Sequence, residues 1–267
     1  MKTAIKLNDF DLDETLDCGQ AFRFERQSDG SYTGFVTDKF VHISKTDDRF
    51  TLEGDGDEDF WLDYLDAETD YGNLKRLYSK ENTLKSACEY ASGIRLLRQD
   101  AFESLISFII SQNNNIPRIK GIIARLCENF GTKTENGYAF PTFEQMCDLN
   151  ADDLAVIRAG FRAKYIVDAT EKIKNGEINL NDIKVMPIED ARKALMTIKG
   201  VGPKVAECVL LYGMHRTEAF PVDVWIKRVM EQYYPNGFPE EFADTAGIAQ
   251  QYLFHYIRTA KENVTKN

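Results

Sequence analysis

A lysine and an aspartate stand at the starts of two successive predicted helices, beside a pair of glycines. The segment from Gly200 to Asp223 reads GVGPKVAECVLLYGMHRTEAFPVD. Lys204 falls in the first turn of a helix, where the helix dipole disfavours a positive charge and so favours the neutral amine that a nucleophile requires. Asp223 suits the N-cap of the next helix. Each alone has a plainer explanation, as a surface lysine and a helix cap, but together they favour chemistry at a sugar beside a held phosphate.

The glycine pair breaks the chain between two helices. One helix is predicted over residues 188–198, and the next runs from Pro203 to about Gly213. A dinucleotide fingerprint would need a third glycine where Val205 stands, and a P-loop sequence is absent. What remains is a helix-hairpin-helix, in which the backbone can approach an anion closely. We therefore expect a nucleic-acid phosphate to be held by backbone groups of Gly200, Val201 and Gly202.

Further blocks along the chain follow a known family pattern in the family's order. They are Cys18–Arg23 (CGQAFR), Gly93–Asp100 (GIRLLRQD), Ser111–Arg118 (SQNNNIPR), Gly160–Arg162 (GFR) and Gln250–Phe254 (QQYLF). With the hairpin, Lys204 and Pro221–Asp223, they resemble the helix-hairpin-helix DNA glycosylases, and among these the 8-oxoguanine DNA glycosylase/AP lyases. The resemblance covers nearly the whole chain.

The resemblance implies base excision of 8-oxoguanine from double-stranded DNA. The damaged nucleotide is flipped out, because its sugar cannot be reached inside the base stack. Lys204 would attack C1′ and form a Schiff base, and β-elimination would then cut the strand. Asp223 would stabilise the positive charge that develops on the sugar. We expect a monomer with no cofactor and no metal site built from side chains, although the hairpin carbonyls offer a place for a monovalent cation.

The same resemblance implies a pocket for the flipped base. The carbonyl of Gly19 would accept a hydrogen bond from N7–H, which 8-oxoguanine has and guanine lacks. Gln250 and Phe254 would bind and stack on the base, and their spacing places both on one side of a helix. Cys208 would pack on the other face of the base.

A second implied set of residues fills the gap that flipping leaves in the duplex. Asn113, Arg118 and Arg162 would contact the orphaned cytosine, whose O2 and N3 suit guanidinium donors. Phe161 would be the apolar wedge. Excision opposite cytosine is therefore expected to exceed excision opposite adenine.

Three residues depart from the family pattern. Tyr212 stands where the closest relatives have methionine, and Lys199 stands where proline is common before the hairpin. Trp225 replaces a histidine that contacts phosphate; its indole N–H can donate one hydrogen bond, so we keep it as an expected DNA contact.

The distribution of charge along the chain indicates how strongly the protein would bind DNA. Of the net charge of −10, nearly all lies in residues 1–100, with 13 basic and 22 acidic residues. The motif-bearing remainder is close to neutral, so we expect weak nonspecific DNA affinity with marked salt sensitivity.

The five cysteines are scattered, which argues against a disulfide framework, a zinc site and an iron–sulfur cluster. No signal-like or membrane-spanning run occurs, so we expect no membrane association and an intracellular protein, cytoplasmic and nucleoid-associated in a prokaryote or nuclear in a eukaryote.

The fold expected from periodicity is α+β. Strands are predicted over residues 21–27, 31–37, 40–45 and 50–53, as an antiparallel meander with a turn at Asp29-Gly30. Beyond about residue 57 the pattern is helical, with later helices over residues 99–112, 118–129, 142–149, 151–159, 163–175 and 244–261. We divide the chain into an N-terminal antiparallel sheet domain with flanking helices, residues 1–93, and a helical helix-hairpin-helix catalytic domain, residues 94–267.

Two other functions fit part of the sequence. An alkylbase glycosylase of the same superfamily would usually lack the lysine, so Lys204 speaks against it. A noncatalytic helix-hairpin-helix DNA-binding module needs only the glycines and leaves Lys204, Asp223, Gly19 and Gln250 unexplained.

Overall fold

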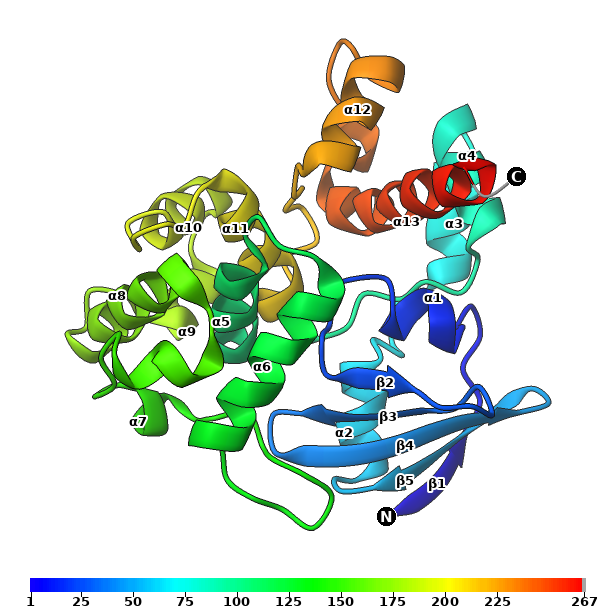
Figure 1. Ribbon diagram of the computed structural model, residues 1–267. Helices are drawn as coiled ribbons and strands as arrows, with labels where there is room; N and C mark the ends of the chain where they lie inside the picture. The colour runs from blue at the N-terminus through cyan, green and yellow to red at the C-terminus, as the bar shows by residue number, and fades with distance from the viewer. Residues whose placement is uncertain (266–267) are drawn as a thin grey trace.

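The computed structural model describes residues 1–265, and side chains for residues 1–259. Its N-terminal part is a five-stranded antiparallel sheet in the order β1-β5-β4-β3-β2 (Figure 1). The strands are β1 (Lys2–Ile5), β2 (Phe24–Arg26), β3 (Tyr32–Val36), β4 (Lys39–Thr46) and β5 (Arg49–Gly54). The predicted meander is confirmed, including the turn at Gly30, whose φ is +87°. The edge strand β1 was not predicted from the sequence, because four residues are too few for alternation to show.

The sheet buries one face through period-two alternation. Along β3, alternate residues are buried, and Tyr32 and Val36 join an apolar cluster with Trp61 and Tyr64 of α2 (Glu58–Tyr64). The short α1 (Leu12–Leu16) packs into the same cluster. A second, larger cluster lies among the remaining helices. The predicted α+β architecture is thereby confirmed.

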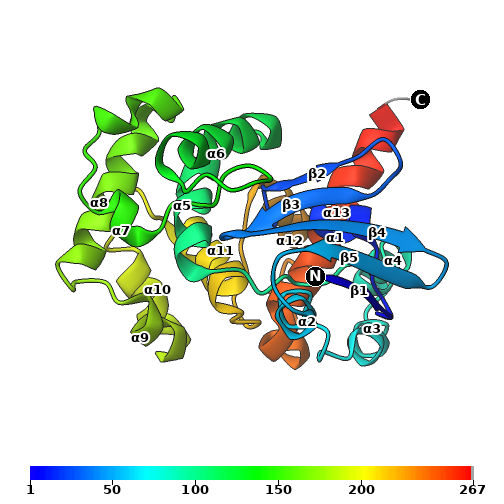
Figure 2. The ribbon, with the colours of Figure 1, turned by 90° about the horizontal axis from the view of Figure 1, so that it is seen from below.

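The helical part is arranged around one buried helix, α5 (Ala101–Ser111). Figures 1 and 2 show α5 and α6 (Ile116–Phe130) between the sheet on one side and α7 to α10 on the other. Those outer helices are α7 (Phe143–Met146), α8 (Ala163–Lys174), α9 (Leu180–Val185) and α10 (Ile188–Leu195). The chain continues through α11 (Pro203–Cys208), a π-helical turn (Val209–Gly213), α12 (Val224–Tyr233) and α13 (Ala246–Thr265).

Several predicted helices differ from the structure in length or type. The helix expected from Pro203 to about Gly213 is α-helical to Cys208 and π-helical over Val209–Gly213, and the helix expected over 188–198 ends at Leu195. The helix expected over 142–149 covers only Phe143–Met146. The helix expected over 151–159 is a 3₁₀ helix, Asp153–Ile157, which ends where Arg158 turns to a φ of +58°. Two further short 3₁₀ turns lie at Gly160–Arg162 and Glu240–Thr245.

Two of the helices before residue 93, α3 and α4, pack with the helices after it. Tyr78 of α3 (Tyr71–Tyr78) and Leu84 of α4 (Asn82–Tyr90) belong to the large helical cluster, and α4 packs on α13. In the other direction, Leu97 joins the sheet cluster. Residues on each side of position 93 thus pack into the apolar cluster of the other side, and the domain boundary expected there stays a prediction. No helix among the described residues is long and apolar enough to cross a membrane.

Candidate active site

The two glycines of the hairpin have different roles: Gly200 forms the turn, and Gly202 leaves free space beside the start of α11. Gly200 has a φ of +80°, and a Cβ at this position would overlap the ring of Tyr165. Gly202 has an ordinary φ of −95°, and a Cβ there would meet nothing within 4 Å. Between them the Val201 amide donates to the Ile198 carbonyl at 3.0 Å. The first glycine therefore supports the turn, and the second leaves free space beside the start of α11.

This difference predicts opposite effects of two similar substitutions. Gly200→Ala is expected to lower the free energy of unfolding by about 2 kcal/mol or more, because it combines a left-handed φ with overlap on a packed ring. Gly202→Ala should leave the free energy of unfolding unchanged or slightly raised, because its backbone is allowed for alanine. Urea unfolding of both variants measures this. Equal losses in the two would contradict the assignment.

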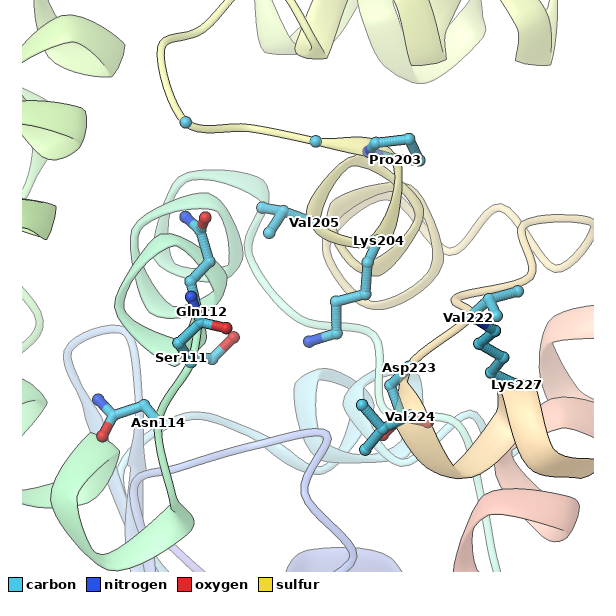
Figure 3. Close-up of a pocket in the computed structure, with 13 residues that line it drawn as sticks. Ser111, Gln112, Asn114, Pro203, Lys204, Val205, Val222, Asp223, Val224 and Lys227 are labelled. Carbon is cyan, nitrogen blue, oxygen red and sulfur yellow. The ribbon is translucent and has the colours of Figure 1, made fainter.

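Lys204 and Asp223 line the same cavity, of about 610 Å³. Pro203 occupies the first turn of α11, as predicted, and Lys204 follows it. The Lys204 side chain extends from α11 into the space between the end of α5 and Asp223 (Figure 3). Its Nζ lies 5.5 Å from the centroid of the Phe108 ring. The remaining lining comes from residues 111–114 of the α5 terminus, the hairpin, Val222, Val224 and Lys227.

Asp223 caps α12 with one carboxylate oxygen. Its Oδ1 accepts hydrogen bonds from the amides of Trp225 and Ile226 at 2.9 and 2.8 Å, which confirms the predicted N-cap. The cap fixes the orientation of the carboxylate, so Asp223 can act on a group in the cavity without changing its conformation. A preoriented negative charge of this kind is suited to stabilise a developing cation.

A smaller recess of about 50 Å³ adjoins Lys204 and Asp223. The structure brings the four predicted base-binding residues together here, from three distant segments. Gly19, Cys208, Gln250 and Phe254 all line the recess. Tyr212 and Pro221, both of which belong to the segments compared with the family, also line the recess, and so does Phe108, which was not identified because it carries no distinctive spacing.

Two aromatic rings form one wall of the recess. Phe108 and Tyr212 stack with centroids 5.1 Å apart and planes 16° from parallel. The Tyr212 hydroxyl donates to Gln251 Oε1 at 2.6 Å, and burial raises the pKa of Tyr212 well above its ordinary value. Tyr212, which stands where relatives have methionine, is thus a neutral, fixed wall of this recess.

Gln250 presents an unused acceptor at the recess. Its Nε2 donates to the Pro221 carbonyl at 3.0 Å. Its Oε1 is buried and accepts no hydrogen bond from any residue that the structure describes. Because buried polar atoms are nearly always paired in native proteins, this oxygen indicates a missing donor.

The four residues expected at the gap in the duplex lie near one another but differ in how exposed their side chains are. Asn113 is exposed with a φ of +46°, and Arg118 is exposed in the first turn of α6. Phe161 is 51% exposed, which is unusual for so large an apolar side chain. Arg162 is only 2% exposed, and burial, then the charge of Arg118, lower the pKa of its guanidinium.

Arg162 is held by backbone carbonyls. Its Nε donates to the Gln112 carbonyl at 2.8 Å, and its terminal nitrogens donate to the carbonyls of Gln112, Asn113 and Ala159. The guanidinium therefore fixes the chain segment after α5, which lines the cavity opposite Lys204. This positioning contact was not expected from the sequence, and a contact of Arg162 with cytosine stays a prediction.

Trp225 lies outside both cavities. The Arg228 guanidinium sits 5.0 Å from the centroid of its ring, and the residue is half-buried. The cation that lines the main cavity from α12 is Lys227 instead, which sequence analysis did not identify. All five cysteines are free thiols, and within the described part of the chain no group of histidine, cysteine or acidic residues could hold a metal ion.

Comparison with known proteins defines the class of this fold and site. Residues 2–105 match the family described as 8-oxoguanine DNA glycosylase, N-terminal domain, and residues 106–241 match the HhH-GPD superfamily of base excision DNA repair proteins. The chain therefore belongs to the HhH-GPD superfamily of base excision DNA repair proteins and carries the N-terminal domain of the 8-oxoguanine DNA glycosylases.

Individual relatives agree with this placement. A probable N-glycosylase/DNA lyase of Methanothermobacter thermautotrophicus is 34% identical, over 68% of this chain and 69% of the relative. The structure of MBOgg1 in complex with a low affinity DNA ligand has a TM-score of 0.92 and 43% identity, covering 97% of this chain and 96% of that chain. The Clostridium acetobutylicum 8-oxoguanine glycosylase/lyase, in complex with double-stranded DNA containing cytosine opposite 8-oxoguanine, has a TM-score of 0.90 and 38% identity, covering 98% of both chains.

Proposed function

We propose that this protein removes 8-oxoguanine from duplex DNA through a covalent bond to Lys204 and then cleaves the damaged strand. The chain is a DNA glycosylase with lyase activity, of the family described above. The observation that carries the residue assignment is that Lys204 and Asp223 line both recesses at once. The larger recess opens beside the hairpin and the smaller one ends at Gln250, so sugar and base can occupy adjoining spaces.

The reaction begins with attack of the neutral Lys204 amine on C1′ of the flipped nucleotide. The bond from C1′ to the base nitrogen breaks, and its electron pair leaves with the base, which then takes up a proton. Asp223 stabilises the positive charge on the sugar while this bond breaks. The resulting N,O-acetal loses a proton from nitrogen, and its C1′–O4′ bond then breaks while O4′ takes up a proton, which leaves a Schiff base between Lys204 and C1′. Loss of a proton from C2′ then expels the 3′ phosphate by β-elimination and cuts the strand.

Gln250 supports recognition of a guanine-type base. The edge of such a base carries N1–H and N2–H₂ donors, and the unpaired Oε1 of Gln250 is the acceptor that they would satisfy.

The partner strand is expected to be read by Arg118. Arg118→Ala should shrink the preference for excision opposite cytosine over adenine by roughly tenfold, because one base-specific contact contributes about 1–3 kcal/mol. We choose Arg118 over Arg162 because loss of the Arg162 contacts would also release the Gln112 and Asn113 carbonyls. Single-turnover rates opposite each base measure the ratio.

A matched control separates base contact from loss of charge. Arg49→Ala removes the same charge from an exposed position on β5 and should keep the wild-type ratio. An unchanged ratio in Arg118→Ala would remove this residue from the partner-strand contact.

The substrate itself is tested with four duplexes that carry 8-oxoguanine opposite each of the four bases. We expect strand cleavage, fastest opposite cytosine. Binding of these duplexes without base release would instead favour a noncatalytic DNA-binding module. We further propose that the protein acts as a monomer inside the cell, without a membrane and without a cofactor beyond a monovalent cation on the hairpin backbone.

A further inference from the structure

One buried carboxylate beside the active site has no part in the chemistry above. Glu207 lies on α11 one turn after Lys204 and is only 6% exposed. Its Oε1 forms an ion pair with the Arg192 guanidinium of α10. Its Oε2 accepts a hydrogen bond from the Phe220 amide at 2.7 Å. Glu207 therefore contacts two segments besides its own helix.

These contacts connect the parts that carry the two reacting groups. Glu207 follows Lys204 by three residues, and Phe220 precedes Asp223 by three residues. The hydrogen bond thus joins the helix of Lys204 to the loop that ends at Asp223. Through Arg192 the same carboxylate also holds α10, the first helix of the hairpin.

Packing alone does not explain why a charged carboxylate is buried at Glu207. Taking a carboxylate out of water costs several kcal/mol, and apolar residues of similar volume often stabilise a fold as well as a buried ion pair does. What an apolar residue cannot do is accept the Phe220 N–H, since a charge-assisted hydrogen bond fixes both distance and direction. Glu207 is therefore placed to set geometry.

We propose that Glu207 is a positioning residue that fixes the Asp223 loop relative to Lys204. This inference rests on the function proposed above. A displacement of about 1 Å between reacting groups can lower a rate by roughly a hundredfold. The expected signature is therefore a slower chemical step with DNA binding retained.

The test compares Glu207→Ala and Glu207→Gln with Glu103→Ala. Glu103 is a matched control: it is a mostly buried carboxylate that pairs with Arg23 at 3.5 Å and accepts the Thr37 amide at 3.0 Å, away from the active site. For each variant we measure the melting temperature, the affinity for a duplex with a tetrahydrofuran abasic analogue, and the single-turnover excision rate at a temperature where all are folded.

Glu207→Ala is expected to lower the single-turnover rate by about ten- to a hundredfold, with duplex affinity within about twofold of wild type. Glu207→Gln should recover most of the rate, because its amide oxygen still accepts the Phe220 N–H. Glu103→Ala should lose stability but keep the rate. If Glu207→Ala fails to fold, the double variant Arg192→Met/Glu207→Met keeps the volume and carries the same expectation.

A wild-type rate in folded Glu207→Ala, or in the folded double variant Arg192→Met/Glu207→Met, would overturn the proposal. So would a rate loss in Glu103→Ala as large as that in Glu207→Ala, since it would show an effect of stability alone. Failure of the proposed function is a separate result, because it would appear as a wild-type protein that releases no 8-oxoguanine.

Discussion

Replacing Lys204 by glutamine is expected to abolish strand cleavage, with a loss in single-turnover rate of roughly 10³-fold or more. Glutamine is one atom shorter than lysine but keeps a polar side chain beside Phe108, and its amide nitrogen is not nucleophilic and cannot form a Schiff base. Affinity for a duplex that contains 8-oxoguanine should change little, because base and phosphate contacts remain. Gel analysis of cleavage and a binding titration measure the two quantities.

Lys193→Gln is the matched control for this change. Lys193 is an exposed lysine of α10, and its amine lies 3.6 Å from Asp190, outside both cavities. This variant should cleave at the wild-type rate. Cleavage by Lys204→Gln at a comparable rate would show that another amine is the nucleophile.

Replacing Asp223 by asparagine is the second change with a large expected effect. Base excision should slow by roughly 10²- to 10³-fold, because a charge that acts mainly on the transition state is removed. The amide oxygen of asparagine can still accept from the Trp225 and Ile226 amides, and asparagine caps helices about as well as aspartate. The melting temperature should therefore stay close to that of the wild type.

Asp223→Ala separates the cap from the chemistry. It removes both, so it should match the slow rate of Asp223→Asn and also lose about 1 kcal/mol of stability. If Asp223→Asn excises at the wild-type rate, the role of Asp223 is reduced to that of a cap.

The hairpin and its neighbours were predictable because local rules determine them. A positive φ requires a residue such as Gly200, a proline is favoured in the first turn of α11, and an aspartate caps α12. Each rule acts within a few residues, so it can be applied to sequence alone. The strands could be predicted for the same reason, because the alternation of apolar and polar residues is also a local pattern.

The base recess was predictable only through the family resemblance. Its walls come from Gly19, Cys208 and Gln250, and no local pattern shows that residues so far apart will meet. The packing of α4 on α13 likewise joins residues far apart in the sequence, so no local pattern could predict it.

Arg162 and Glu207 show what neither periodicity nor resemblance reveals. The partners of Arg162 are backbone carbonyls about 50 positions away, and every residue type supplies a carbonyl. One of the two partners of Glu207 is likewise a backbone group, the Phe220 amide. A contact to the backbone does not depend on the residue type of its partner, so the sequence pattern does not predict it.

The most direct test of the proposed chemistry is borohydride trapping on a duplex with 8-oxoguanine opposite cytosine, followed by identification of the modified peptide. Borohydride reduces a Schiff base to a stable amine, so a covalent protein–DNA adduct is expected, with the modification on Lys204. Base release without any adduct, or an adduct on a different amine, would contradict the assignment of Lys204 as the nucleophile.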